Sequence, residues 1–373
     1  MRIGFDAKRA FNNYSGLGNY SRYVISNICR FYPENECLLY TPQIADTELF
    51  NEPAGSTIGM PGPGIWKHSG SFWRSFRLTH RLKGDAIDLY HGLSNELPAG
   101  IHKSRIRSVI TIHDLIFLEH PELYQAFSRN IYKRKVRYGT RVASRIIAAS
   151  EQTKEDIVRL LNVDESRISV VYQGCHRQFY ERVNEESMQN TRKQFALPSE
   201  YLLYVGTIEE RKNLLKIVQA LHQGNIDFPL VVVGRKTPYF NLVKQYIERK
   251  GLSNIHFLNQ VQASDLPAIY QGSAGFIYPS SYEGFGIPVL EALNSGVPVI
   301  TSRGGCLEET AGKGGIFINP SDQEEMIHAI SQVLDKSALR DRLVREGGVH
   351  ALKFREEQTI PTLYNLYLEC MHD

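Results

Sequence analysis

Residues 275–302 read GFIYPSSYEGFGIPVLEALNSGVPVITS and predict a strand, a loop, a helix and a second strand in close succession. Apolar β-forming residues fill 275–278 and 297–301, and Gly286 and Pro288 suit the opening of the helix between them. Two strands joined through one helix run parallel in the same sheet. The stretch therefore predicts an α/β domain built on a parallel sheet.

The same alternation extends along the whole chain of 373 residues. Strands are expected over residues 2–7, 37–41, 87–90, 107–112, 146–149 and 168–171, and again over 201–205, 230–233, 255–258, 275–278, 297–301 and 315–318. Helix-like segments separate most of them. This pattern predicts doubly wound sheets, and the length predicts two Rossmann-like domains with ligands held in the cleft between them.

A polar stretch over residues 181–194 (ERVNEESMQNTRKQ) lacks strand character, and we place the domain junction there. The expected N-terminal domain covers residues 1–185 and the expected C-terminal domain covers 186–350. Residues 351–373 are expected to form a C-terminal helix that packs back on the first domain.

The composition is that of an ordinary folded protein, with 42% hydrophobic and 22% charged residues. No run approaches the roughly 18 apolar residues that a spanning helix needs, so we expect a cytoplasmic protein. The five cysteines are scattered and include no C-x-x-C pair, which argues against a disulfide framework or a zinc site.

Charge is unevenly distributed along the chain. Residues 1–180 hold 24 Lys and Arg against 17 Asp and Glu, whereas the remainder holds 19 against 23. The first half is therefore basic and the second half acidic. This asymmetry predicts that the first half meets an anionic partner.

The helix predicted after residue 286 offers an anion site, because the first N–H groups of a helix have no partner within it. Glu283 lies in the loop just before this helix, and Glu291 follows about two turns later. Two carboxylates near a phosphate site can accept hydrogen bonds from sugar hydroxyls. By themselves, two glutamates at this spacing are more often a loop acid and a solvated helix residue.

The run EGFGIPVLEA over residues 283–292 resembles the E-x7-E motif of the retaining glycosyltransferases of family 4, which have the GT-B fold. The resemblance implies that Glu283 contacts the donor sugar and Glu291 the ribose hydroxyls. It also implies donor contacts from the loop between them, at Gly284, Phe285, Gly286 and Ile287.

Residues 204–213 (YVGTIEERKN) are similar to the strand, glycine and Arg-Lys-Asn segment of the same family. The resemblance implies donor contacts from Gly206, Arg211 and Lys212. Two fixed cations can stabilise the diphosphate as it leaves, in place of a metal ion. Cations at a helix start oppose the helix dipole, so their presence there favours a bound anion over a solvated pair. We expect no metal and no cofactor besides the nucleotide-sugar substrate.

The loop over residues 299–312 (VITSRGGCLEETAG) is similar to another family segment but departs from it. Gly305 and Cys306 stand where the family has serines, and Glu308 stands in place of a proline. Backbone amides of this loop can still donate hydrogen bonds to a phosphate. Hydroxyl contacts from these positions are put in doubt.

A glycine-rich turn over residues 12–20 (NNYSGLGNY) follows the first strand. It lacks the third glycine of a dinucleotide fingerprint, since residue 21 is Ser, and no acid ends the next strand, which excludes NAD. Resemblance to the family's loop implies donor contacts from Gly16 and Gly18 and acceptor contacts from Asn19 and Tyr20. A purely structural turn is the alternative.

Two histidines are expected at the carboxyl ends of strands. His113, in the segment TIHDL, is implied by the resemblance to contact the donor sugar, with Asp114 orienting it or capping the next segment. His91, in LYHG, is expected either to contact the acceptor or to be a packed or surface histidine. Val261 is expected near the nucleobase, because residues 259–261 follow a strand of the second domain.

Two basic regions remain, one over residues 66–83 with interleaved aromatic residues and one over residues 129–145 on a predicted helix. A solvated helix face is one interpretation, and contact with anionic lipid headgroups is the other. Nucleic acid is disfavoured, because no nucleic-acid-binding motif accompanies the charge.

These features together predict a retaining, metal-independent hexosyltransferase that resembles bacterial mannosyltransferases of surface-polysaccharide assembly. The predicted donor is GDP-mannose, and the predicted acceptor is a glycan or a lipid-linked saccharide. A UDP-sugar donor, a sugar-nucleotide epimerase on the same fold and a non-catalytic sugar-binding protein are the alternatives. The predicted catalytic residues are His113, Glu283, Arg211 and Lys212.

Overall fold

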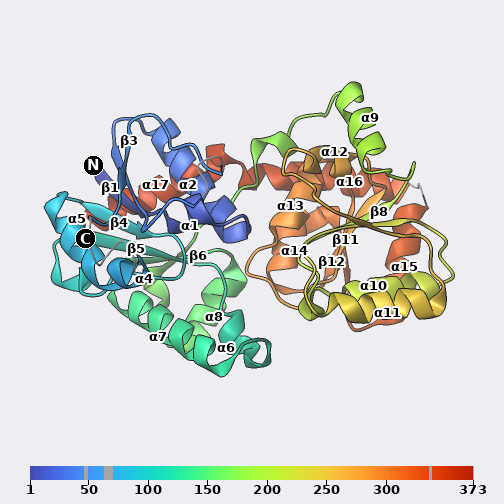
Figure 1. The fold of residues 1–373 in the computed structure, drawn as a ribbon, viewed down its shortest axis with the longest axis horizontal. Helices are drawn as coiled ribbons and strands as arrows, with labels where there is room; N and C mark the ends of the chain where they lie inside the picture. Colours follow the sequence, from blue (N-terminus) through green and yellow to red (C-terminus); the bar gives the residue numbers. More distant parts are fainter. Residues whose placement is uncertain (46–48, 63–69, 336–337, 373) are drawn as a thin grey trace. The chain divides into compact units, whose positions relative to one another are not determined.

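The computed structural model describes residues 1–45, 49–62, 70–335 and 338–372, and the chain divides into two compact units (Figure 1). The first unit contains Met1–Gly174 and Phe354–Asp373, and the second contains Cys175–Lys353. The division therefore falls after Gly174, ahead of the polar stretch where the junction was expected.

The first unit is built on a parallel sheet that has seven strands within the described residues, in the order β3-β2-β1-β4-β5-β6-β7. The strands are β1 (Arg2–Asp6), β2 (Glu36–Tyr40), β3 (Ser56–Gly59), β4 (Leu89–Gly92), β5 (Arg107–Ile112), β6 (Arg145–Ala148) and β7 (Ile168–Val170). The helices are α1 (Lys8–Asn12), α2 (Gly16–Phe31), α4 (Gly70–Phe72), the π-helix η1 (Trp73–Arg77), α5 (Leu78–Gly84), α6 (Ile116–Glu119), α7 (Ala126–Val142), α8 (Glu151–Leu161) and α17 (Glu356–His372).

Alternation along the strands of this sheet builds two apolar cores, one on each face. In β2, Cys37 and Leu39 pack with α1, α2 and α17, whereas Leu38 and Tyr40 pack with η1, α5, α7 and α8. Both faces are thus covered by helices, as a doubly wound parallel sheet requires. The edge strand β3 was not predicted, because its four residues include only one large apolar side chain.

The second unit contains a parallel sheet with six strands in the described residues, in the order β10-β9-β8-β11-β12-β13. The strands are β8 (Leu202–Val205), β9 (Leu230–Val233), β10 (Ile255–Leu258), β11 (Gly275–Tyr278), β12 (Val299–Ser302) and β13 (Gly315–Ile318). The helices are α9 (Glu185–Gln194), α10 (Leu214–Gln223), α11 (Phe240–Lys250), α12 (Leu266–Gln271), α13 (Ile287–Asn294), α14 (Gly305–Ala311), α15 (Gln323–Leu334) and α16 (Ala338–Ala351). The predicted α/β class with two doubly wound parallel sheets is confirmed.

Side-chain contacts explain why the polar stretch near residue 185 belongs to the second unit. The ring of Phe179 meets that of Tyr270 at 5.6 Å, and the Gln271 side chain bonds the backbone of Glu181 and Val183. Part of the stretch forms α9, which Asn184 caps by accepting from the Ser187 amide at 2.8 Å.

Helix α17 returns to the first unit from the far end of the chain (Figure 1). Its Tyr364 ring stacks on Tyr32 at 3.6 Å, and Tyr23 and Thr359 share a hydrogen bond of 2.5 Å. Ile360, Leu363 and Tyr367 complete the apolar core under β1 and β4. Among the described residues, no helix is both long enough and apolar enough to cross a membrane.

Candidate active site

The strands β8 and β11 are neighbours in the second sheet although they are not consecutive, which makes their carboxyl ends the switch point of the sheet. Ligands of doubly wound sheets bind at such a point. Gly206 follows β8, and the loop that contains Glu283 follows β11. The two most specific sequence motifs of the chain therefore meet at the expected place.

Close backbone approach explains two glycines at this edge. A Cβ on Gly234, after β9, would lie 1.8 Å from the Gly206 carbonyl oxygen. Gly206 itself has φ +155°, and a Cβ there would come 3.2 Å from the Tyr278 ring and 3.4 Å from Lys212 Nζ. A larger residue at Gly234 would push apart the ends of β8 and β9, whereas one at Gly206 would be strained in its backbone and would crowd Tyr278 and Lys212.

Asn213 fastens the Arg-Lys turn to the loop that follows β11. It adopts a left-handed conformation with φ 55° directly after the 3₁₀ turn η6 (Glu210–Lys212). Its amide donates to Pro279 O at 2.8 Å and to Ser281 Oγ at 2.9 Å. The Ser281 amide in turn donates to Arg211 O at 2.9 Å. These bonds hold both cations against the Glu283 loop.

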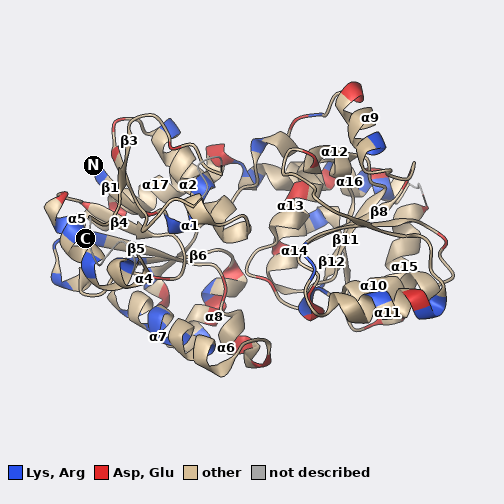
Figure 2. Ribbon diagram, viewed as in Figure 1, with Lys and Arg blue, Asp and Glu red and all other residues tan. Residues whose placement is uncertain are grey.

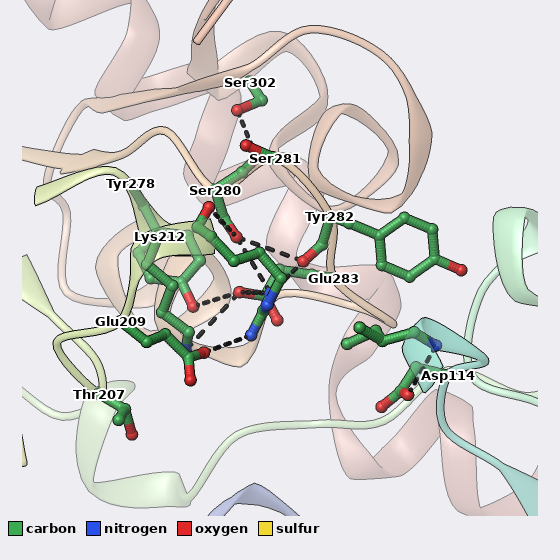
Figure 3. Close-up of polar contacts among 12 residues, drawn as sticks. Asp114, Thr207, Glu209, Lys212, Tyr278, Ser280, Ser281, Tyr282, Glu283 and Ser302 are labelled. Atoms are coloured by element: carbon green, nitrogen blue, oxygen red, sulfur yellow. Dashed lines mark hydrogen bonds and ion pairs between the residues drawn. The ribbon is translucent and has the colours of Figure 1, made fainter. Parts of the chain in front are cut away.

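The two cations are already neutralised by carboxylates (Figure 3). Glu283 Oε1 lies 2.7 Å from Arg211 Nη1 and 3.6 Å from Lys212 Nζ, and it accepts a hydrogen bond of 2.8 Å from the Tyr278 hydroxyl. Glu209 Oε1 lies 2.6 Å from Arg211 Nη2. Two positive and two negative charges therefore form one network, in which a phosphate would compete with Glu283.

Burial opposes the ionisation of Glu283, but Lys212 and Arg211, aided by the Tyr278 hydroxyl, outweigh it and lower the pKa of this carboxyl. Burial likewise disfavours the charge of Arg211, yet Glu283 and Glu209 raise the pKa of its guanidinium. Both members of the pair are thus charged at neutral pH. The network is therefore an electrostatic site in which an incoming anion has to displace Glu283 from the two cations.

Glu291 lies in a different environment, inside α13. Its side chain is buried, and one carboxyl oxygen accepts from the Tyr270 hydroxyl at 3.0 Å. Burial raises the pKa of Glu291 to about 8, while the Tyr270 bond acts in the opposite direction. The two glutamates of the motif therefore have oppositely shifted pKa values.

The start of α13 offers fewer amides than the sequence predicts. Pro288 has no N–H, and the amides of Val289 and Leu290 both donate to Gly286 O. A phosphate would therefore bind nearer to the loop over residues 284–287, where Phe285 is buried and contributes its backbone alone. Gly286 has φ 122°, and a Cβ there would lie 2.8 Å from Leu307, so this position requires glycine.

Helix α14 supports the same loop, in part through Cys306, which departs from the family pattern. The Cys306 thiol donates to Glu283 O at 3.0 Å, and the Thr310 hydroxyl donates to Phe285 O at 3.0 Å. Glu308 accepts from the Gly304 amide at 2.6 Å, which closes the turn before the helix. Cys306 and Thr310 therefore hold the Glu283 loop, whereas Glu308 stabilises the turn that opens α14.

A pocket of about 370 Å³ opens at the carboxyl ends of β9 and β10. It is lined by residues 233–236 and 258–261, which include Val261. Lys236 Nζ donates to Asn259 Oδ1 at 3.2 Å across this pocket. Its place beside the switch point suits the nucleobase end of a nucleotide ligand.

In the first unit, His113 follows the carboxyl end of β5 and is 6% exposed. Its Nε2 lies 2.9 Å from Leu93 O, so Nε2 carries the proton and Nδ1 can accept a hydrogen bond. Burial lowers the pKa of His113 to about 4, although the Leu93 bond opposes this effect. His113 is therefore neutral. Asp114 caps the next segment, because it accepts from the Ile116 amide at 3.2 Å.

His91 does not have the place expected of an acceptor contact. It lies within β4 and is fully buried, with Nδ1 2.5 Å from the Tyr367 hydroxyl and Nε2 2.7 Å from Thr111 Oγ1. Tyr20 is buried as well, with its hydroxyl 2.9 Å from Thr111 Oγ1 and its ring edge-on to His113 at 4.6 Å. These two residues support the position of His113 and present no surface to an acceptor.

The glycine-rich turn combines one required glycine with one that is not constrained. A Cβ on Gly18 would lie 1.9 Å from Asn13 O, whereas a Cβ on Gly16 would meet nothing within 4 Å. Asn19 is exposed, and its Oδ1 accepts from Arg22 Nη2 at 2.5 Å. Of the three expected acceptor contacts, only Asn19 lies on the surface.

Comparison with known families agrees with this arrangement of two units. Residues 22–179 match the model described as Glycosyltransferase Family 4, and residues 187–348 match the model described as Glycosyl transferases group 1. The chain belongs to the family 4 glycosyltransferases. The predicted enzyme class is thereby confirmed, and a non-catalytic sugar-binding protein is no longer an alternative.

Two relatives of this glycosyltransferase are named for mannosyl transfer. The O-antigen chain mannosyltransferase B of Escherichia coli is 29% identical and matches over 98% of this chain and 99% of that protein. The O-antigen chain mannosyltransferase RfbU of Salmonella typhimurium is 26% identical over 60% of each protein. Among solved structures, sucrose-phosphate synthase from Thermosynechococcus elongatus has the same fold, with a TM-score of 0.79 and 18% identity over 99% of this chain and 98% of that one.

The sequence did not reveal several residues that complete the site of this glycosyltransferase. Tyr278, Glu209 and Asn213 each contact the Arg-Lys pair or Glu283, and Gly234 shapes the strand ends. Tyr278 ends β11 and Gly234 follows β9 directly, so their positions at carboxyl strand ends could have marked them as candidates. Glu209 and Asn213 flank the Arg-Lys turn further along the loop after β8, and only their contacts in the folded structure reveal their roles.

Proposed function

We propose that this glycosyltransferase moves a mannosyl residue from GDP-mannose to a glycan or lipid-linked saccharide acceptor, with retention of the anomeric configuration. The observation that carries the choice of sugar is the match of almost the whole chain to an O-antigen chain mannosyltransferase. The second O-antigen relative supports the same sugar.

In this proposal the second unit holds the donor across the switch point. The guanine base occupies the pocket between β9 and β10, which includes Val261, and Glu291 receives the ribose hydroxyls from inside α13. Arg211 and Lys212 bind the diphosphate. The backbone of residues 284–287 directly follows Glu283 and contacts the same donor molecule.

Glu283 changes partners in the proposed reaction. In the structure it neutralises Arg211 and Lys212. A diphosphate brings more negative charge to these cations than one carboxylate does, so it displaces Glu283 toward the sugar hydroxyls. Tyr278, which bonds Glu283 at 2.8 Å, keeps the carboxylate at the edge of the sheet during this exchange.

The transfer breaks the bond between the anomeric carbon and the diphosphate oxygen, and it joins that carbon to an acceptor oxygen whose proton is released. Negative charge grows on the diphosphate as the bond breaks, and the two cations stabilise it. Because His113 is neutral, we assign it a hydrogen bond to the donor sugar through Nδ1 and no proton transfer. Asn19 is the exposed residue of the first unit that we assign to the acceptor.

A donor panel with product analysis tests this function. The protein is incubated with GDP-mannose, UDP-glucose, UDP-galactose and UDP-N-acetylglucosamine, with and without an oligosaccharide acceptor, and products are followed by NMR. We expect α-mannoside from GDP-mannose only when acceptor is present. Preferential transfer from a UDP-sugar would contradict GDP-mannose as the donor. Inversion at the anomeric carbon would contradict a retaining mechanism. Epimerisation of the donor without acceptor would contradict glycosyl transfer as the reaction.

A further inference from the structure

Helix α7 carries a concentration of positive charge that the transfer reaction does not use. Its 17 residues, AFSRNIYKRKVRYGTRV, include six cations and no acid (Figure 2). Lys135 pairs with Glu96 at 3.0 Å. Within the described part of the chain, the other five form no ion pair. They are Arg129, Lys133, Arg134, Arg137 and Arg141.

The structure corrects the extent of both basic regions. Helix α7 ends at Val142, and Arg145 lies in β6. In the other region, Trp66 and Lys67 lie outside the described residues, while Trp73 and Arg74 are buried. Arg74 Nη1 lies 2.7 Å from Asp6 Oδ2, and its Nη2 pairs with Glu96. Phe72 and Phe76 remain exposed beside Arg77, Arg81 and Lys83, but Arg81 pairs with Asp85. Among the described residues, the larger set of cations without an ion pair is therefore that of α7.

The outward face of α7 combines its cations with exposed apolar side chains. Phe127 is 78% exposed and Ile131 38% exposed, and Leu123 in the preceding turn η3 (Pro121–Leu123) is 42% exposed. The opposite side is fixed to the sheet, since Val136, Gly139 and Thr140 are buried and a Cβ on Gly139 would lie 2.5 Å from Ile110. The apolar residues lie at the beginning of the helix, and Arg134, Arg137 and Arg141 lie beyond them.

We propose that this face of α7 docks on a bilayer that contains anionic lipids. Exposed cations attract anionic headgroups, and Phe127, Ile131 and Leu123 can insert at the boundary between headgroups and acyl chains. Cations would suit nucleic acid equally well, and Phe127 could stack on a base, but the aliphatic side chains of Ile131 and Leu123 gain nothing from either contact. The combination favours a lipid surface.

The position of α7 relates this surface to the proposed site in the first unit. The helix begins after the carboxyl end of β5, where His113 lies, and ends before the amino end of β6. Its apolar end is therefore at the same edge of the sheet as His113. An acceptor carried by a membrane lipid would reach that edge when α7 rests on the membrane.

Vesicle sedimentation with the full chain tests the proposal. The matched pair of variants reverses three exposed cations on α7 (Arg134→Glu, Arg137→Glu, Arg141→Glu) or three on α11 of the second unit (Lys244→Glu, Arg249→Glu, Lys250→Glu). Vesicles of phosphatidylcholine with about one third phosphatidylglycerol are compared with pure phosphatidylcholine. Phe127→Ser is paired with Leu242→Ser, which alters an exposed apolar side chain on α11. Thermal unfolding of each variant shows that it is folded.

We expect binding to the anionic vesicles only, weakening as salt is raised. Loss of three headgroup contacts should reduce the affinity of the α7 variant about a hundredfold or more, whereas the α11 variant should stay within a few-fold. Phe127→Ser should weaken binding and Leu242→Ser should not. Equal losses in both triple variants, no binding to anionic vesicles, or tighter binding to an oligonucleotide would overturn the proposal. Vesicle binding requires neither donor nor acceptor, so this result and the proposed transfer can fail independently.

Discussion

Glu283 Oε1 lies 2.7 Å from Arg211 Nη1, so the carboxylate expected to hold the sugar is paired with a cation expected to hold the diphosphate. Sugar binding and diphosphate binding thus meet in one ion-pair network. Binding the donor requires exchange of partners within this network, and each residue of it should have a distinct kinetic effect when it is changed.

Removing both cations should strongly reduce the catalytic efficiency of transfer. Charge-assisted hydrogen bonds contribute about 1.5–3 kcal/mol each, so Arg211→Ala combined with Lys212→Ala should lower kcat/KM roughly 10²–10⁴-fold. Lys244→Ala, on the exposed face of α11, is the control and should change little. Steady-state kinetics with the preferred donor measure the effect. A double variant within threefold of the parent would show that these two cations do not hold the diphosphate.

Tyr278 should act as a positioning residue for Glu283. Tyr278→Phe removes the 2.8 Å bond to the carboxylate but keeps the ring that lies 5.3 Å from Lys212 Nζ. We expect kcat to fall about tenfold or more and nucleotide affinity to change only a few-fold. Tyr204→Phe is a matched control, because that hydroxyl bonds only Thr207 O, at 3.2 Å, among the hydrogen bonds that the structure describes. Equal kinetic effects of the two substitutions would show that Tyr278 has no such role.

Stability should depend on pH through Glu291. Its pKa is about 8 in the folded protein and 4.5 in the unfolded chain, so between these values the folded state holds more protons. The free energy of unfolding should therefore fall as pH rises from about 5 to about 8, by up to a few kcal/mol. Urea unfolding of the parent and of Glu291→Gln across this range measures the difference. Parallel curves for the two proteins would contradict the raised pKa.

Turnover should not need an added divalent metal, because Arg211 and Lys212 supply the positive charge at the diphosphate. Excess EDTA should leave the rate nearly unchanged. Collapse of activity with EDTA and its recovery with Mg²⁺ or Mn²⁺ would mean that a metal does this work instead.

The strands of both sheets could be predicted from the sequence because short runs of apolar, β-forming residues mark them locally. The strands β5, β9, β10, β11 and β13 coincide with the runs read from the sequence, and both glutamate and Arg-Lys motifs lie at the edge expected of them. Periodicity and strand-end rules are local, so they hold without knowledge of the tertiary structure.

Long-range contacts explain what the sequence could not predict. His91 and His113 both follow apolar strand runs, but His91 is enclosed by Tyr367 from α17, more than 270 residues away in the sequence. The pairing of Glu283 with Arg211 depends on Asn213, which fixes one loop to the other by bonds to Pro279 and Ser281. Neither contact leaves a local pattern.

The most direct test of the donor site combines calorimetric titration of GDP with steady-state kinetics for Glu283→Gln and Glu291→Gln. The assays are run at about pH 8.5, above the pKa of Glu291, so that both substitutions remove a charge. Glu283→Gln frees Arg211 and Lys212, so GDP affinity should be unchanged or higher, while kcat falls roughly 10²-fold because a transition-state contact is lost. Glu291→Gln should weaken GDP binding and raise the donor KM with little change in kcat, as expected for uniform binding. If instead Glu283→Gln loses GDP affinity and Glu291→Gln loses only kcat, the two roles are reversed and the donor lies differently in the site.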